Sequence, residues 1–72
     1  MTTLDTLPTG GAGRIRKLNG ASDSCNRLRE MGFAENAVVR CLREGRPLLC
    51  QVQHSRVGIS QELAHQVLIE VL

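Results

Sequence analysis

Five side chains in this 72-residue chain could ligate a metal ion or act as nucleophiles. They are three cysteines and two histidines, namely Cys25, Cys41, Cys50, His54 and His65. None forms a Cys-x-x-Cys or His-x-x-x-His pair, the close spacing in which structural zinc sites usually present their ligands. Free cysteine is among the most buried residue types, so we expect Cys41 and Cys50 to be small apolar core residues. The residue types leave open the alternative of a redox-active or metal-binding pair.

The sequence does not predict an enzyme. Nucleophilic catalysis needs a cysteine or serine held against a base and an oxyanion donor, and no spacing in the chain supports such a set. Gly11-Ala12-Gly13 could suggest a phosphate-binding loop, but no Gly-Lys-Ser/Thr sequence follows it, so we interpret it as a plain turn. A chain of this length also has little room for a cleft.

The positive charges of the chain do not indicate a nucleic-acid partner. Nine lysines and arginines against seven acidic residues give a net charge of only +2. Two basic sets could contact phosphates: Arg14, Arg16 and Lys17, and then Arg40, Arg43 and Arg46. The chain has one aromatic residue, Phe33, whereas proteins that bind single strands stack several aromatic rings on the bases. We therefore interpret both sets as solvated strand faces.

Hydropathy and cysteine content indicate a cytoplasmic protein. The longest uninterrupted apolar stretches have three residues, such as 67–69, and a bilayer span needs about 20. We expect no direct membrane insertion. The N-terminus lacks the basic and apolar regions of a secretory signal. Three cysteines are an odd number and too few for a disulfide scaffold, which suits a reducing compartment.

The clearest predicted element is a helix over residues 22–31. Ser22 or Ser24 is expected to cap its N-terminus. Leu28 and Met31 share its apolar face with Cys25. Gly32 stands where a left-handed residue commonly ends a helix, and the following Phe33 is expected to contact Leu28, as in a Schellman motif.

Strands account for most of the remaining pattern. We expect strands at 14–18, 37–43, 48–54, 56–59 and 67–71, a turn at 34–36 and a helical turn at 61–65 capped by Ser60. The hairpin around loop 44–47 is predicted to pair Val39 with Val52, Cys41 with Cys50, and Arg43 with Leu48. In the last strand, Val67, Ile69 and Val71 are expected to point inward.

These short strands predict a mainly β fold. They are best buried by curling into a small barrel, which would also remove free edges. We expect one domain over residues 1–72, with a flexible or loosely packed segment at 1–10. Several leucines fall outside the small core or at its ends in this arrangement: Leu4, Leu7, Leu42, Leu49, Leu68 and Leu72. They either form an apolar surface for a protein partner or fill the barrel ends.

Residues 13–18 (GRIRKL), 27–33 (RLREMGF), 57–64 (VGISQELA) and 67–71 (VLIEV) together resemble the FeoA family, the ferrous iron transport protein A domains. The resemblance covers residues 4–72, and the block at 27–33 is its most specific part. It implies an SH3-like β-barrel in the cytoplasm that is non-enzymatic, needs no cofactor and is accessory to FeoB, a membrane ferrous-iron transporter with a cytoplasmic GTP-binding domain. A related SH3-like module occurs in iron-dependent repressors, which keeps a regulatory role open. Such domains usually have Pro-Gly in the turn after the phenylalanine, where this chain has Glu35-Asn36, and Asn36 can adopt the same backbone geometry.

The leading hypothesis is therefore an interaction module that docks on the cytoplasmic part of FeoB. We expect the docking patch to involve five apolar residues: Leu28, Met31, Phe33, Leu42 and Leu49. One alternative is a metal-responsive domain that uses Cys25, Cys41, Cys50 and His54, although no metal site is predicted from their spacing. Another is stimulation of GTP hydrolysis by an exposed arginine, with Arg14, Arg40, Arg43 and Arg46 as candidates. The spare leucines and edge strands also leave room for weak self-association.

Overall fold

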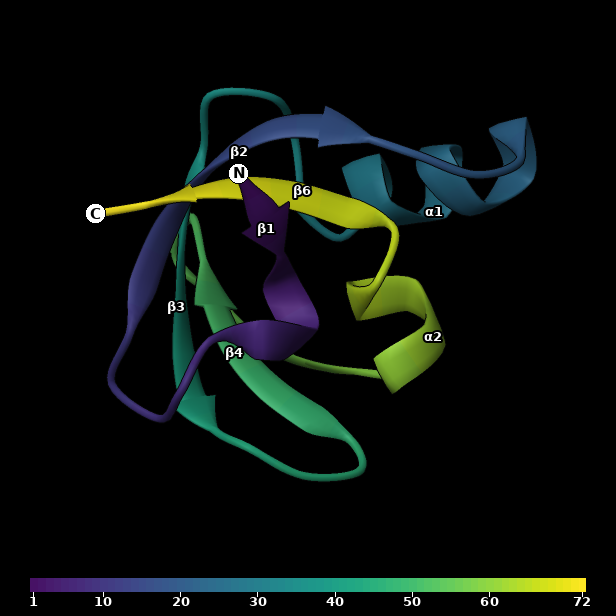
Figure 1. The fold of residues 1–72 in the computed structure, drawn as a ribbon. Coiled ribbons are helices and arrows are strands. Elements are labelled where there is room, and N and C mark those ends of the chain that lie inside the picture. The colour runs from purple at the N-terminus through teal and green to yellow at the C-terminus, as the bar shows by residue number, and fades with distance from the viewer.

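Six antiparallel strands form one sheet in the computed structural model, which describes residues 1–72. Their hydrogen-bonded order is β1 (Thr2–Thr3), β6 (Val67–Val71), β2 (Ala12–Leu18), β3 (Val38–Arg43), β4 (Leu48–Val52) and β5 (Ser55–Ile59). The sheet curls on itself, with α1 (Ser22–Glu30) and α2 (Gln61–Ala64) beside it (Figure 1). This arrangement confirms the predicted mainly β fold, with one helix after the first long strand and a helical turn before the last.

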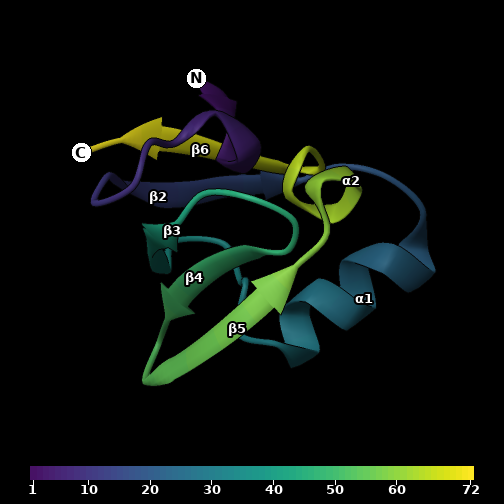
Figure 2. The ribbon, with the colours of Figure 1, turned by 90° about the horizontal axis from the view of Figure 1, so that it is seen from below.

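The curled sheet keeps two ends. β1 pairs only with β6 and β5 pairs only with β4, so no strand ladder joins the first strand of the order to the last. The expectation that curling removes free edges is therefore wrong. A short 3-10 helix, η1 (Leu4–Thr6), follows β1 and lies against α2 (Figure 2).

The core is entirely apolar. Sixteen hydrophobic residues are buried and form one cluster, and no polar or charged residue is buried. Leu4 and Leu7 are 0% and 3% exposed, so of the two predicted alternatives they fill the core and do not form an apolar surface for a partner. β1 pairs with β6, and this pairing places the following η1 over the core. Leu4 and Leu7 are therefore buried. Whether residues 1–10 are mobile stays a prediction.

The remaining apolar residues of the chain ends and strands differ in exposure. Val71 was predicted to point inward but is 57% exposed, because it is the last residue of β6 and extends beyond the core. Leu72 is exposed as expected. Leu42, Leu49 and Leu68 are half-buried.

The β3–β4 hairpin has the predicted register over most of its length. Cys41 lies opposite Cys50, and the pairs on either side follow. Arg43, however, lies opposite Leu49 and not Leu48, because a bulge between Cys41 and Arg43 inserts Leu42 as an extra residue. Without the bulge, the alternation of side chains would turn Arg43 to the same face as Cys41, into the core. The bulge therefore keeps the guanidinium in solvent while Leu48 stays buried.

Helix α1 ends in the predicted Schellman motif. Gly32 has φ +103°, and the Phe33 amide donates to the Leu28 carbonyl at 2.9 Å. The Gly32 amide donates to the Arg29 carbonyl at 3.0 Å, which completes the pair of bonds that defines the motif. Leu28 and Phe33 are both fully buried, so the turn fixes the direction in which the chain leaves the helix for β3.

The two helices begin differently. The predicted caps at Ser22 and Ser24 are wrong, because Ala21 occupies the N-cap position of α1 and no side chain caps the helix. The predicted cap of α2 is confirmed, since the Leu63 amide donates to Ser60 Oγ at 3.1 Å. The turn at Asn36 also has the expected left-handed backbone, with φ +75°.

We expect Gly32→Val to lower the free energy of unfolding by about 1–2 kcal/mol, because a β-branched side chain is strained at positive φ. Space is not the limiting factor, since a Cβ at this position would lie 3.4 Å from Val52 Cγ1, an ordinary contact. Chemical denaturation measures the change. Gly32→Asn is the control and is expected to lose less, and equal losses for the two variants would refute a conformational cause.

Candidate interaction surface

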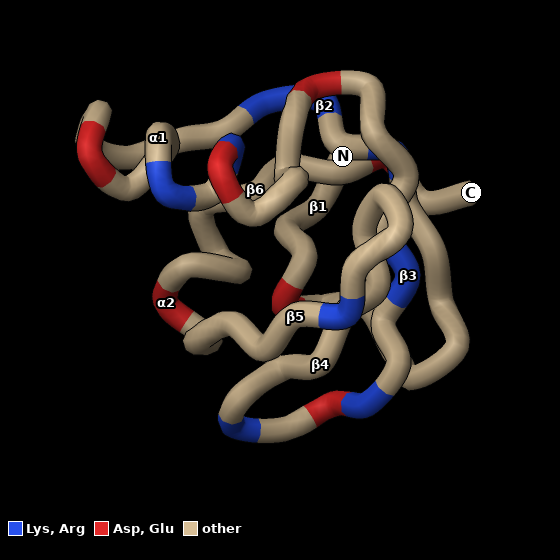
Figure 3. The backbone as a smooth tube through the Cα atoms, turned by 180° about the vertical axis from the view of Figure 1, so that it is seen from behind, with Lys and Arg blue, Asp and Glu red and all other residues tan.

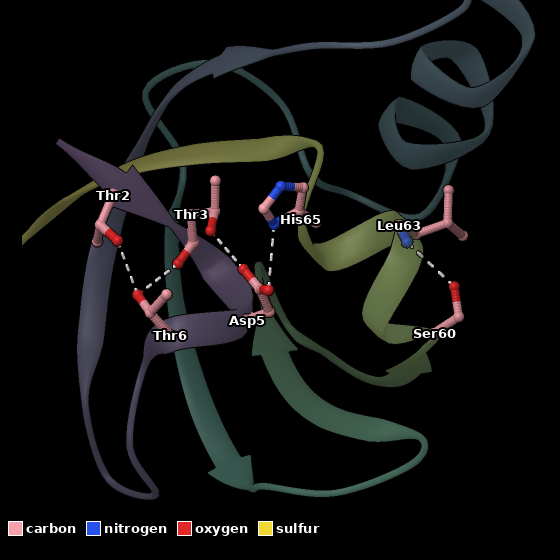
Figure 4. A network of polar contacts seen from close by, with 7 residues as sticks. All are labelled: Thr2, Thr3, Asp5, Thr6, Ser60, Leu63 and His65. Carbon is pink, nitrogen blue, oxygen red and sulfur yellow. Dashed lines mark hydrogen bonds and ion pairs between the residues drawn. The ribbon is translucent and has the colours of Figure 1, made fainter.

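A polar network joins the start of the chain to α2 (Figure 4). The Asp5 carboxylate, on η1, accepts a hydrogen bond from the Thr3 hydroxyl. Its other oxygen lies 3.2 Å from His65 Nδ1, at the end of α2. The side chains come from positions 60 residues apart, so this contact holds η1 against α2.

The electrostatics of Asp5 follow from this network. Partial burial by itself raises the pKa of the Asp5 carboxyl. The hydrogen bonds from Thr3 and His65 and the charge of the imidazole together outweigh burial, so the pKa lies below its usual value. The ionised carboxylate is therefore the form that the folded protein stabilises.

A depression in the surface adjoins the network. It has a volume of about 410 Å³ and is lined by five residues, Asp5, Gln61, Glu62, His65 and Gln66. All of these residues are polar, and none is a cysteine or serine that the imidazole could activate. This open hollow differs from the enclosed, mostly apolar pockets that organic ligands usually occupy.

The candidate metal ligands do not gather into one site. Cys41 and Cys50 face each other across β3 and β4, and both are fully buried. Cys25 lies at the start of α1, where its Sγ is 3.6 Å from the Asn19 carbonyl oxygen. His54 is exposed in the turn between β4 and β5. No three His, Cys, Asp or Glu side chains come together as a metal centre.

Burial makes the facing thiols weak acids. It raises the pKa of Cys50 to about 12, and the neighbouring Cys41 adds to the effect. Burial and the charge of Glu44 raise the pKa of Cys41 as well. The thiolate is the form that binds metals, so this environment disfavours metal binding by the pair at neutral pH.

A mixed apolar and basic surface lies on the other side of the same strands. We define the outer face as the solvent side of β3, β4 and β5, where side chains alternate with those of the core. Its members are Val38, Arg40, Leu42, Arg43, Leu49, Gln51 and Arg56. Arg40, Gln51 and Arg56 lie directly opposite one another across the three strands. Val38 is 42% exposed, and Leu42 is the bulge residue that precedes Arg43, the partner of Leu49.

The outer face has no negative charge. β3, β4 and β5 contain no aspartate or glutamate, whereas β3 and β5 contain arginines (Figure 3). Arg40 donates to the Gly10 carbonyl, and Arg56 has no ion-pair or hydrogen-bond partner. Elsewhere, carboxylates neutralise arginines, as in the pairs of Arg16 with Glu70 and of Arg29 with Glu35. The face thus joins exposed and half-buried aliphatic groups with unneutralised positive charge.

The five residues predicted for a docking patch fall into two groups. Leu28 and Phe33 are fully buried and Met31 is half-buried, so these three support α1 and the turn after it. Leu42 and Leu49 belong to the outer face. Sequence reasoning did not include Arg40 and Arg56 in the patch, although the two-residue alternation of strands 37–43 and 56–59 carried that signal.

Fold and surface together define a small SH3-like barrel that presents a sheet face and has no enclosed site. The model of the FeoA domain matches residues 2–71. FeoA of Stenotrophomonas maltophilia, a procaryotic SH3 domain protein complexed with zinc, is 32% identical over 97% of this chain and 90% of its own, with a TM-score of 0.86. The chain belongs to the FeoA family, whose members are non-enzymatic accessory proteins associated with ferrous iron transport.

More distant structures share the fold. An iron uptake regulatory protein, FeoA, superposes with a TM-score of 0.93 at 23% identity, over 99% of this chain and 97% of its own. A manganese-dependent transcriptional repressor superposes at 0.88 with 12% identity, over 97% of this chain and 41% of the repressor. No curated protein matches the chain. No helix is long and apolar enough to cross a membrane.

We expect Asp5→Asn to lower the thermal midpoint at pH 5. The loss of stability should be less than about 1 kcal/mol, because Asp5 and His65 are partly exposed and solvent weakens their interaction. The folded pKa of Asp5 lies below the unfolded one, so its contribution is complete above the unfolded pKa and disappears as pH falls through the folded one. Melting curves between pH 5 and pH 2 should converge for wild type and variant. Glu30→Gln, which changes an exposed acid outside any ion pair, is the control and should show no such convergence.

Proposed function

We propose that this protein works in the cytoplasm as an interaction module that docks on the cytoplasmic part of FeoB and thereby modulates ferrous iron uptake. The observation that carries the proposal is the outer face, where exposed and half-buried aliphatic side chains and unneutralised arginines lie together without a carboxylate. A family of non-enzymatic proteins associated with iron transport acts through contacts with other molecules, which supports a docking role.

The composition of the outer face suits a protein partner. Aliphatic groups and arginine are common in protein interfaces, where arginine is enriched relative to lysine. The face also lies on paired strands, whose register fixes the spacing of these residues along the sheet. Positive charge on this face favours an acidic surface on FeoB, and attraction between unlike charges speeds association at low salt.

The β5 edge borders the outer face. Its outward backbone groups have no strand partner, since β5 pairs only with β4. Gly58 and Arg56 lie on this strand, and neither blocks approach from the edge with a bulky apolar group. A docked segment of FeoB can therefore contact both the side chains of the face and the backbone of its edge.

An NMR titration of the labelled protein with the cytoplasmic part of FeoB tests the proposal. We expect shift changes over β3, β4 and β5, and binding that weakens as salt increases. Arg56→Glu should weaken binding roughly threefold to tenfold. Arg27→Glu on α1 is the matched control, because Arg27 is also an exposed arginine without an ion-pair partner.

Two outcomes contradict the proposal. One is the absence of shift changes at high FeoB concentration, with and without guanine nucleotide. The other is equal weakening by Arg56→Glu and Arg27→Glu, which would show that net charge and not the outer face is recognised. GTP turnover measured in the same samples tests the arginine alternative, and we expect little or no change in the rate.

A further inference from the structure

Cys41 and Cys50 form a cross-strand pair of a particular type. The Cys41 amide donates to the Gly11 carbonyl at 2.9 Å, and the Cys41 carbonyl accepts from the Gly10 amide at 2.8 Å. Both backbone groups of Cys41 therefore point away from β4. A facing pair in this situation is a non-hydrogen-bonded pair, in which the Cα atoms are about 4.5 Å apart and the side chains lie closest.

The Cα separation expected for such a pair suits a disulfide. Disulfides span Cα separations from about 4.4 to 6.8 Å, so the expected separation of this pair falls within the range. Both side chains point into the core, as their complete burial shows, so their Cβ atoms lie on the same face of the hairpin. The third cysteine, Cys25, lies on α1. Its thiol donates to the carbonyls of Leu18 and Asn19 at the end of β2.

We propose that Cys41 and Cys50 are a modification site that peroxide converts into an intramolecular disulfide joining β3 to β4. One thiol is first oxidised to a sulfenic acid, with release of one water. The sulfur of the second thiol then attacks the sulfenic sulfur, the S–S bond forms and a second water leaves. In total the two thiols lose two protons and two electrons, and one hydrogen peroxide is reduced to two waters.

Burial determines how the site responds. Fully buried thiols with raised pKa react slowly, so the folded protein resists mild oxidation. Access requires local opening, for which the end strand β5 is suited because it pairs only with β4 and places Val57 directly opposite Cys50. Once formed, the disulfide closes a short loop that contains the bulge at Leu42, and it thus fixes the strands beneath the outer face.

Ferrous iron, the ion with which this family is associated, reduces peroxide and is consumed in that reaction. Peroxide would therefore both oxidise the two thiols and remove ferrous iron. A covalent response to peroxide would link the hairpin to the conditions in which ferrous iron is lost. The proposal does not depend on docking to FeoB, since the disulfide is detected in the isolated protein.

The test treats the full chain with graded hydrogen peroxide and counts free thiols by alkylation in denaturant. We expect two of the three thiols to be lost, the intact mass to fall by about 2 Da, and peptide mapping to join Cys41 to Cys50. Low, non-denaturing urea should accelerate the reaction, because it increases local opening. The oxidised protein should also melt at a higher temperature than the reduced protein.

Matched variants separate the pair from the third cysteine. Cys25→Ala should form the disulfide like wild type, and Cys50→Ala should not form it. Cys50→Val serves if the alanine variant fails to fold, because it fills the space in the core. Retention of all three thiols at the highest peroxide concentration in low, non-denaturing urea would overturn the proposal, as would a disulfide that contains Cys25 or joins two chains.

Discussion

A core without any polar side chain is the constraint on which the rest of this structure depends. With 16 apolar residues packed in a chain of 72, every charged group must find a place outside them. Burying an unpaired charge costs far more than a small domain can offset, because total stability is only about 5–15 kcal/mol. The bulge at Leu42 is one result, since it turns Arg43 outward at a position where regular alternation would bury it.

The same constraint explains why the charged groups lie where they do. Arginines on β3 and β5 point to solvent because the alternate positions of those strands fill the core. Acidic residues are concentrated in helices, loops and β6, where several of them pair with other arginines or with Thr9 and His65. The outer face is therefore positive because β3 and β5 contain arginines and no acidic residues. The alternation of side chains along the strands turns these arginines to solvent.

Local patterns predicted the local structure well. The Gly32-Phe33 ending of α1, the Ser60 cap and the pairing of Cys41 with Cys50 each depend on neighbouring residues or on two-residue alternation. The burial of Leu4 could not be predicted in this way, because β1 has two residues and pairs with a strand at the other end of the chain. The bulge was also missed, since it follows from the cost of burying Arg43 and not from any turn residue. The leucines of the outer face were found, but combining them with Arg40 and Arg56 required the register of three strands.

The pairing of Thr2 with Ile69 brings the two chain ends to one side of the barrel (Figure 1). Because neither end passes through the core to reach solvent, a longer polypeptide can enter and leave this unit at a single place. Such a unit tolerates insertion between other modules or tethering at either end without rearrangement of its strands. A similar fold makes up less than half of a manganese-dependent repressor, as expected for a unit that can be joined to other domains.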